Sequence, residues 1–212
     1  MNRMFKRYLY FFLGVIINSF GVAFITKSAL GTSQISSVPY VLSLKFPALS
    51  FGAFTFIMNM GFILLQVIIL KKDFHPIQFL QVGANIIFSL VIDLGMAVLG
   101  FFQPETLAAR LVSLLAGCVV LAFGICVEVA PNILFVPGEG LVNAISSKSG
   151  MKFGTAKICF DVTLIVVAGL LSFIFFGRLN GVGLGTVISA LAVGKIVNVL
   201  NRHLKFFRKI PR

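Results

Sequence analysis

The sequence has few charged side chains and very few acidic ones. Asp, Glu, Lys and Arg make up 11% of its 212 residues, and only six residues are acidic, whereas soluble domains carry about 25% charge. Trp is absent and there are two His. No Ser/His/Asp set, His-Glu-x-x-His pattern or phosphate-binding loop is present. We therefore do not expect an enzyme.

Cysteine is also scarce. Cys118, Cys126 and Cys159 lie in apolar stretches with neither Cys-x-x-Cys spacing nor a nearby His. This pattern favours buried free thiols that act as small apolar side chains. His75 and His203 lie in basic flanks. We expect no metal site and no cofactor.

Apolar residues make up most of the chain. They account for 58% of it, and the mean hydropathy is +1.05, so a soluble fold would expose a large apolar surface. Lipid offers the backbone no hydrogen-bond partner, so apolar runs of about 20 residues predict membrane-spanning helices. We predict an all-α membrane protein forming a single domain, 1–212. Its six expected spans are 8–26, 52–70, 77–101, 107–130, 154–176 and 182–200.

The net charge of +12 does not indicate a nucleic-acid partner. The basic residues lie mainly between the apolar runs and at the chain ends, with no basic helix face. Loops of membrane proteins that face the cytoplasm carry an excess of Lys and Arg. With the amino terminus inside, twelve Lys and Arg fall on inner segments and four on outer ones. This count favours a multi-pass protein with both termini in the cytoplasm.

Two connections are unusual. The stretches 27–51 and 131–153 are too polar to span a membrane and too apolar to be ordinary loops. Such stretches are typical of re-entrant or interfacial segments, which occur at membrane depth only where protein or a cavity surrounds them.

The two halves of the chain resemble each other. Matching features recur in order at offsets of 100 to 103 residues: Gly14 and Gly21 with Gly117 and Gly124, Gly52 and Asn59 with Gly154 and Asp161, and Gly83 with Gly183. We predict two repeats, 1–103 and 104–212, each with three spans and a re-entrant or broken segment. Three spans invert the second repeat relative to the first, an arrangement typical of secondary transporters with a site at the repeat interface.

The sequence PGEGLVN carries the first candidate site residues. Glu139 lies between two glycines, and Asn143 follows four residues later. The functional interpretation is a carboxylate at the tip of a re-entrant segment that binds a cation or a proton. The alternative is an exposed turn carboxylate in a cytoplasmic loop.

Lys157 and Asp161 form a second candidate pair, four residues apart on one predicted helix face. They are either an internal ion pair or a site whose carboxylate changes partner or proton. Asn59 is the neutral counterpart of Asp161 in the first repeat. A polar patch in the first irregular segment serves either substrate binding or helix capping: Thr32, Ser33, Gln34 and Ser36.

Two further acidic residues are expected to be structural. Asp93, late in its span, is expected to reach the outer interface. Glu128, at the end of its span, is expected to meet the inner headgroups or Lys148.

The stretches PGEGLVNAI, FGTAKICFD and GVGLGTVISALAVGK resemble the YczE/YyaS/YitT family of bacterial membrane proteins. The resemblance covers nearly the whole chain. The carboxy-terminal soluble domain of the longer members is missing, which favours the short YczE-type branch. The resemblance implies a bacterial cytoplasmic (inner) membrane protein of two three-helix repeats. Some relatives are classed as small-molecule exporters.

We therefore expect a secondary transporter or exporter of a small molecule, proton-coupled or ion-coupled. The alternative is a non-transporting membrane regulator or scaffold for a partner enzyme. A water-accessible cavity that reaches Glu139 and Asp161 would favour transport, whereas a solid apolar centre would favour a scaffold. Membrane lipid and an unidentified small molecule are the expected partners, and a homodimer is one candidate assembly.

Overall fold

The computed structural model describes residues 3–203, which form helices and connecting turns and contain no β-strand. Six helices are long and apolar enough to cross a membrane, which confirms the prediction of an all-helical chain with six candidate spans. These are α1 (Arg3–Lys27), α3 (Phe51–Leu70), α4 (Leu80–Val98), α5 (Leu107–Val129), α7 (Phe153–Phe176) and α8 (Leu184–His203). The shorter helices are α2 (Ser37–Lys45) and α6 (Pro137–Ser149), with single turns η1 (Lys71–Asp73), η2 (Pro76–Phe79) and η3 (Leu99–Phe101).

Local sequence sets several helix boundaries. Ser50 and Thr106 are N-cap residues whose hydroxyls accept hydrogen bonds, of 3.0 and 3.2 Å, from the amide three residues further on. These bonds satisfy N–H groups that have no partner within the helix. Gly150 and Gly177 end α6 and α7 in the left-handed conformation, which glycine adopts without a steric penalty.

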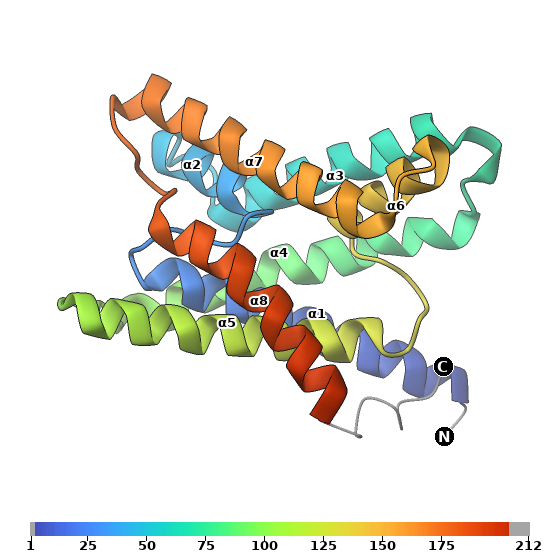
Figure 1. Ribbon diagram of the computed structural model, residues 1–212, viewed down its shortest axis with the longest axis horizontal. Coiled ribbons are helices and arrows are strands. Elements are labelled where there is room, and N and C mark those ends of the chain that lie inside the picture. Colours follow the sequence, from blue (N-terminus) through green and yellow to red (C-terminus); the bar gives the residue numbers. More distant parts are fainter. Residues whose placement is uncertain (1–2, 204–212) are drawn as a thin grey trace.

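Helices α1 and α5 cross closely and run in opposite directions (Figure 1). Glycines line both sides of the crossing: Gly14 and Gly21 on α1, and Gly117 and Gly124 on α5. A Cβ atom at any of the four would collide with the backbone of the other helix. Small residues allow such close approach between membrane helices. Helix α4 packs against α1, and α8 packs against α5.

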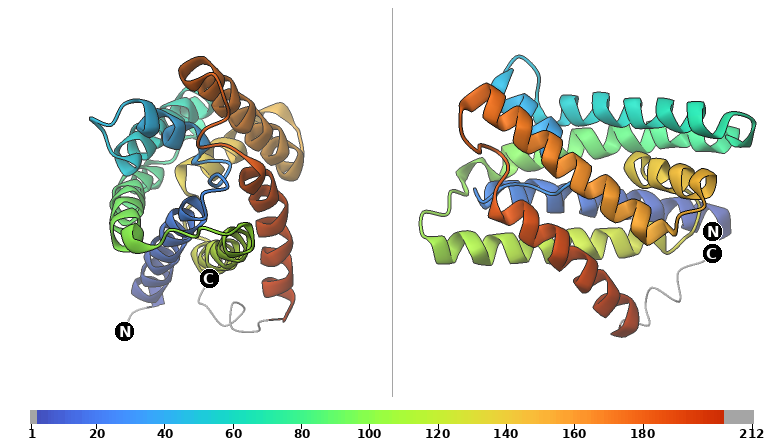
Figure 2. Two further views of the ribbon diagram at one scale, coloured as in Figure 1. Left: turned by 90° about the vertical axis from the view of Figure 1, so that its left-hand side faces the viewer. Right: turned by 45° about the horizontal axis from the view of Figure 1, so that its top comes forward.

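The two halves have the same order of helices: long, short, long, long. The short helices lie at opposite ends of the molecule, with α2 at the left and α6 at the right of Figure 1. Both irregular connections thus contain a helix too short to span a membrane. Helix α2 packs between α3 and α7, and α6 packs against the same two helices (Figures 1 and 2).

The outward surface is rich in apolar side chains. Ile174 on α7 is 74% exposed and Leu184 on α8 is 77% exposed, as expected for helices that contact lipid. The prediction of three buried thiols is wrong for Cys159, which is exposed on α7, whereas Cys118 and Cys126 are buried. Periodicity could not distinguish a lipid-facing from a core-facing thiol, because both neighbourhoods are apolar.

Candidate functional site

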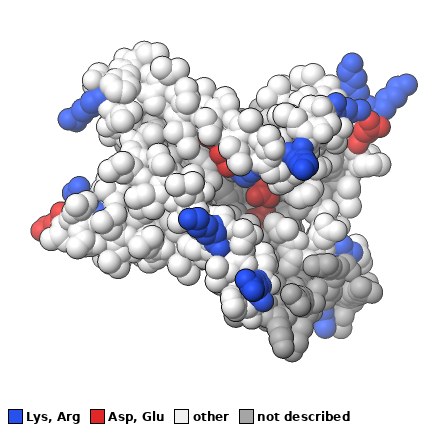
Figure 3. All heavy atoms as spheres, viewed as in Figure 1, with Lys and Arg blue, Asp and Glu red and all other residues white. Residues whose placement is uncertain are grey.

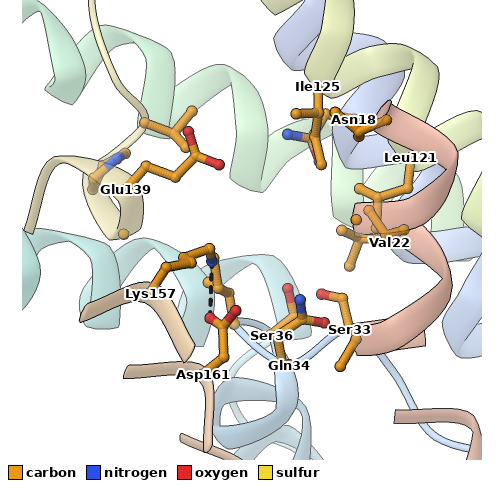
Figure 4. A pocket seen from close by; sticks show the side chains of 18 of the residues that line it. Asn18, Val22, Ser33, Gln34, Ser36, Leu121, Ile125, Glu139, Lys157 and Asp161 are labelled. Carbon is orange, nitrogen blue, oxygen red and sulfur yellow. Dashed lines mark hydrogen bonds and ion pairs between the residues drawn. The ribbon is translucent and has the colours of Figure 1, made fainter. Parts of the chain in front are cut away.

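A cavity of about 610 Å³ lies between the two halves (Figure 4). Its walls come from α1, α3, α4, α5, α7 and α8, and from the segments where α2 and α6 begin. Its size is within the range of small-molecule sites, about 300–1,000 Å³. The centre of the molecule is therefore hollow rather than a solid apolar core.

The cavity opens toward the surface between α7 and α8. Its lining includes Phe153 to Asp161 on the first half of α7 and Ala190 to Asn198 on the second half of α8. Within residues 3–203, α7 and α8 do not pack along their lengths, whereas α3 and α4 do. Figure 3 shows acidic side chains at the bottom of a hollow on this face. The opening therefore connects the carboxylates to the surface of the molecule.

Glu139 projects into the cavity from the first turn of α6 (Figure 4). The start of α6 is fixed by Gln66 on α3, whose Nε2 donates to the Pro137 carbonyl at 3.0 Å and whose amide pairs with that of Gln81 at 3.1 Å. Gly140 leaves room for Gln66, because a Cβ there would lie 2.6 Å from its Oε1. The Pro-Gly-Glu-Gly sequence thus packs the first turn of α6 tightly against α3, and Glu139 projects from this turn.

The Glu139 carboxylate has no hydrogen bond and no ion pair within the described part of the chain, although its side chain is half-buried. Helix α6 is not one of the six candidate spans. Burial raises the pKa of the Glu139 carboxyl, Lys157 opposes this shift, and Asp161 adds to it. The raised pKa extends the pH range over which this carboxyl stays protonated, compared with an exposed one.

Lys157 and Asp161 form an ion pair across one turn of α7, with 2.8 Å between Nζ and Oδ1. Their side chains are 23% and 15% exposed, and both line the cavity. The pair is electrically neutral as a unit. Glu139 is therefore the only acidic group on the cavity wall without a direct cationic partner among residues 3–203.

Three polar side chains on the cavity wall have an oxygen that is buried and without a hydrogen-bond partner among residues 3–203: Gln34 Oε1, Ser36 Oγ and Asn59 Oδ1. Ser36 is 1% exposed and Asn59 is 4% exposed. Buried polar groups nearly always have a partner, so these oxygens are hydrogen-bonding groups that the described residues leave unsatisfied. Figure 4 shows Gln34 and Ser36 beside Ser33, across the cavity from Glu139.

The remaining wall is mostly apolar. Val22, Leu121 and Ile125 face the polar side across the cavity (Figure 4). Asn18 lies beside them, and its Nδ2 donates to Glu128 Oε2 at 2.8 Å. The expectation that Glu128 meets headgroups or Lys148 is wrong, because Glu128 is 2% exposed. Helices α1 and α5 approach so closely at their glycines that the Glu128 side chain is enclosed between them.

Six of the eight predicted site residues line this cavity: Ser33, Gln34, Asn59, Glu139, Lys157 and Asp161. Thr32 and Asn143 do not. Thr32 is fully buried, where its hydroxyl bonds that of Thr26 at 2.6 Å and its N–H donates to Thr186 Oγ1 at 3.2 Å. It joins the irregular segment to α1 and α8. Whether the six lining residues bind a substrate stays a prediction.

Lys148 and Asp93 serve elsewhere in the structure. Lys148 pairs with Asp73 at 2.6 Å on the exposed surface. Asp93 accepts hydrogen bonds from the Gly52 N–H at 2.7 Å and from the Ser50 hydroxyl at 2.5 Å. It therefore holds the first turn of α3 rather than reaching free into an interface.

Sequence reasoning missed Asn198 of the cavity wall, and it also missed Asn18. An isolated amide in an apolar span was a signal for it, because a polar side chain at membrane depth needs a partner. Its partner, Glu128, is 110 residues away. Among residues 3–203, no cluster of three or more His, Cys, Asp or Glu could hold a metal ion.

Comparison with known proteins gives membership of a family but no activity. Residues 5–202 match the model of a family described as a family of unknown function (DUF6198). The chain belongs to this family. No curated protein and no solved structure matches the chain. The DUF6198 match spans both halves, and therefore every residue that lines the cavity.

Proposed function

We propose that this protein is a secondary transporter of a small molecule and that the central cavity is its binding site. The observation that carries the proposal is a hollow built jointly by both halves, with the first turn of α6 and the residues just before α2 in its wall. Broken helices that end at a central site are typical of secondary transporters. A scaffold for a partner enzyme needs no such cavity.

We further propose that the halves are inverted repeats. Their helices have the same order and opposite directions (Figure 1). Ala29 and Asn132, which are 103 residues apart, are two of only three non-glycine residues with positive φ among residues 3–203. This conformation is uncommon outside glycine. Its recurrence at the offset of the glycine pairs supports a duplicated backbone.

An inverted repeat explains why one pair of helices is open and its counterpart closed. The first half of α7 and the second half of α8 flank the opening. Their counterparts, the first half of α3 and the second half of α4, are joined by the Asp93 hydrogen bonds. Exchange of these two arrangements would expose the cavity to the opposite side of the membrane, which is alternating access.

The direction follows from the expected topology. The bias of Lys and Arg places both termini in the cytoplasm. In that orientation the opening between α7 and α8 faces the cytoplasmic side, and the closed α3–α4 side faces outward. The resemblance to the YczE/YyaS/YitT family supports the cytoplasmic membrane of a bacterium as the location. Loading from the cytoplasm favours export.

Proton coupling is proposed to use Glu139. The purified full chain, in liposomes that contain a pH-sensitive dye, would be exposed to a panel of cationic, neutral and anionic small molecules. We expect at least one class to move protons with wild-type protein and none with Glu139→Gln. Asp73→Asn removes an exposed carboxylate far from the cavity and should behave as wild type. If no compound moves protons or accumulates in the liposomes, the scaffold alternative replaces transport.

A further inference from the structure

We propose that the cavity binds a small amine that carries one positive charge, at least one N–H donor and an apolar body. This inference deepens the proposed transport function by naming its substrate class. It rests on three features of the wall: its net charge, the kind of atom left without a partner, and the separation of polar from apolar surface.

The charge of the wall favours a single cation. Lys157 and Asp161 neutralise each other at 2.8 Å, so ionised Glu139 leaves one net negative charge. An isolated buried charge is costly unless it is paired. A ligand with one positive charge supplies that pair. Because a proton would neutralise the same carboxylate, proton and cation compete for Glu139, which is the coupling that the proposed exchange needs.

The hydrogen bonds around Asn59 show which atom type is missing. Asn85 Nδ2 donates to the Phe56 carbonyl at 3.0 Å, so its Oδ1 is the atom that accepts from Asn59 Nδ2 at 2.8 Å. This fixes the orientation of the Asn59 amide and leaves Oδ1 unpartnered. An amide oxygen can only accept. The ligand must therefore present a donor to it.

The helix starts do not favour an anion instead. The amino-terminal end of a helix attracts negative charge, but α6 already has Glu139 in its first turn. In α2 the Ser37 N–H donates to the Gln34 carbonyl, and Pro39 has no N–H. Few free donors thus remain for an anion.

The apolar wall accommodates the body of the ligand. Val22, Leu121 and Ile125 face the polar groups across the cavity (Figure 4). A ligand whose ammonium group pairs with Glu139 can place its apolar part against these side chains. The opening between α7 and α8 is flanked by exposed apolar residues such as Ile158 and Leu191. An amphipathic amine partitioned into the membrane would meet the site there.

Four probes of similar shape test the proposal: phenylpropylamine, phenylpropyl-trimethylammonium, phenylpropanol and phenylpropionate. Their affinities for the purified full chain in lipid nanodiscs would be measured by calorimetry at neutral pH. Charge-assisted hydrogen bonds contribute about 1.5–3 kcal/mol. We therefore expect phenylpropylamine to bind about tenfold or more tighter than phenylpropanol. The quaternary ion keeps the charge but lacks donors and should fall between them.

Variants test which residues cause the preference for the amine probe. Glu139→Gln should lower amine affinity to that of the alcohol, and Ser36→Ala should weaken the amine by severalfold without reversing the order. Asp73→Asn should leave all four affinities unchanged. Tighter binding of phenylpropionate, equal binding of all probes, no binding by any of them, or an amine preference that survives Glu139→Gln would each overturn the proposal. Selective amine binding without proton movement in liposomes would leave the ligand class standing and contradict transport instead.

Discussion

The ends of α3 and α4 and the equivalent ends of α7 and α8 differ in how they are held. In the first half, Asp93 on α4 accepts hydrogen bonds from the Gly52 N–H and the Ser50 hydroxyl at the start of α3. A carboxylate at the start of a helix also benefits from the helix dipole. In the second half, Gly154 has open space around it, and Lys195 occupies the region corresponding to Asp93.

The polar contacts near the middle of the two helix pairs differ as well. Asn59 and Asn85 are hydrogen-bonded between α3 and α4 at 2.8 Å. At the position that corresponds to Asn59, Asp161 pairs with Lys157 on its own helix. Helices α3 and α4 are therefore joined by polar side chains that bond from one helix to the other. Helices α7 and α8 are apart where the polar residue of α7 bonds within its own helix. The cavity opens on the separated side.

The largest effect is expected from Asp161→Asn, which gives the second half the amide type found at Asn59. It leaves Lys157 without its partner in a site where both side chains are mostly buried. Loss of one member of a buried pair is strongly destabilising, and we expect about 2–3 kcal/mol after allowance for partial exposure. Chemical unfolding in detergent measures it.

The surface pair is the matched control for that change. Asp73 and Lys148 are 68% and 46% exposed, so Asp73→Asn should lower the free energy of unfolding far less than Asp161→Asn does. A second variant, Lys157→Met combined with Asp161→Asn, should recover most of the lost stability. Equal losses for the two single variants would show that the α7 pair is not an interior one.

A smaller effect is expected from Asp93→Ala, which removes the acceptor for Ser50 and Gly52. The unsatisfied donors should lower the free energy of unfolding by about 1–3 kcal/mol. The same change should open the α3–α4 side, so a cysteine introduced at Ala84 in the cavity wall should be labelled faster from outside intact cells. Thr163→Val is the control, because Thr163 is exposed and bonds only within α7. A labelling rate unchanged by Asp93→Ala would contradict the idea that the Asp93 hydrogen bonds keep the α3–α4 side closed.

The smallest effect concerns pH. Burial raises the pKa of Glu139, so its protonation should weaken phenylpropylamine binding at a pH above the range near 4.3 where exposed glutamates titrate. The amine stays charged there, like lysine with a pKa of about 10.4. Lys157, Asp161 and buried Glu128 are the other ionisable groups around Glu139.

The expected pH effect on ligand binding is opposite in sign to the pH effect on stability. Binding to wild type should fall with falling pH, and in Glu139→Gln the slope should vanish. Stability from this carboxyl is present when it is protonated and is lost as pH rises through its raised folded-state pKa. Calorimetry and unfolding at matched pH values separate the two. A wild-type binding curve that is flat over the whole pH range in which the protein stays folded would contradict titration of Glu139 at the site.

Much of the framework could be predicted from sequence because it depends on local patterns. Apolar run length predicted the six spans, and four-residue spacing brought Lys157 and Asp161 together. Composition also located the two irregular segments whose helix starts line the cavity.

What could not be predicted depends on contacts between distant segments. The Glu128–Asn18 bond joins residues 110 apart, and the Thr32–Thr186 bond joins residues 154 apart. The opening between α7 and α8 is likewise a difference between two halves whose apolar patterns are alike. Hydropathy does not indicate which of two similar helix pairs is joined by hydrogen bonds between polar side chains.

Alternating exposure of the cavity is tested most directly by distances between spin labels in lipid nanodiscs. One pair joins native Cys159 on α7 to Leu191→Cys on α8. The equivalent pair joins Ile57→Cys on α3 to Leu90→Cys on α4 in a protein whose Cys159 is replaced. All four positions are exposed. In both proteins Cys118 and Cys126 are replaced. We predict two populations that respond to pH, with the α7–α8 distance shortening as the α3–α4 distance lengthens. A single distance for each pair that does not change with pH or with phenylpropylamine would contradict alternating access.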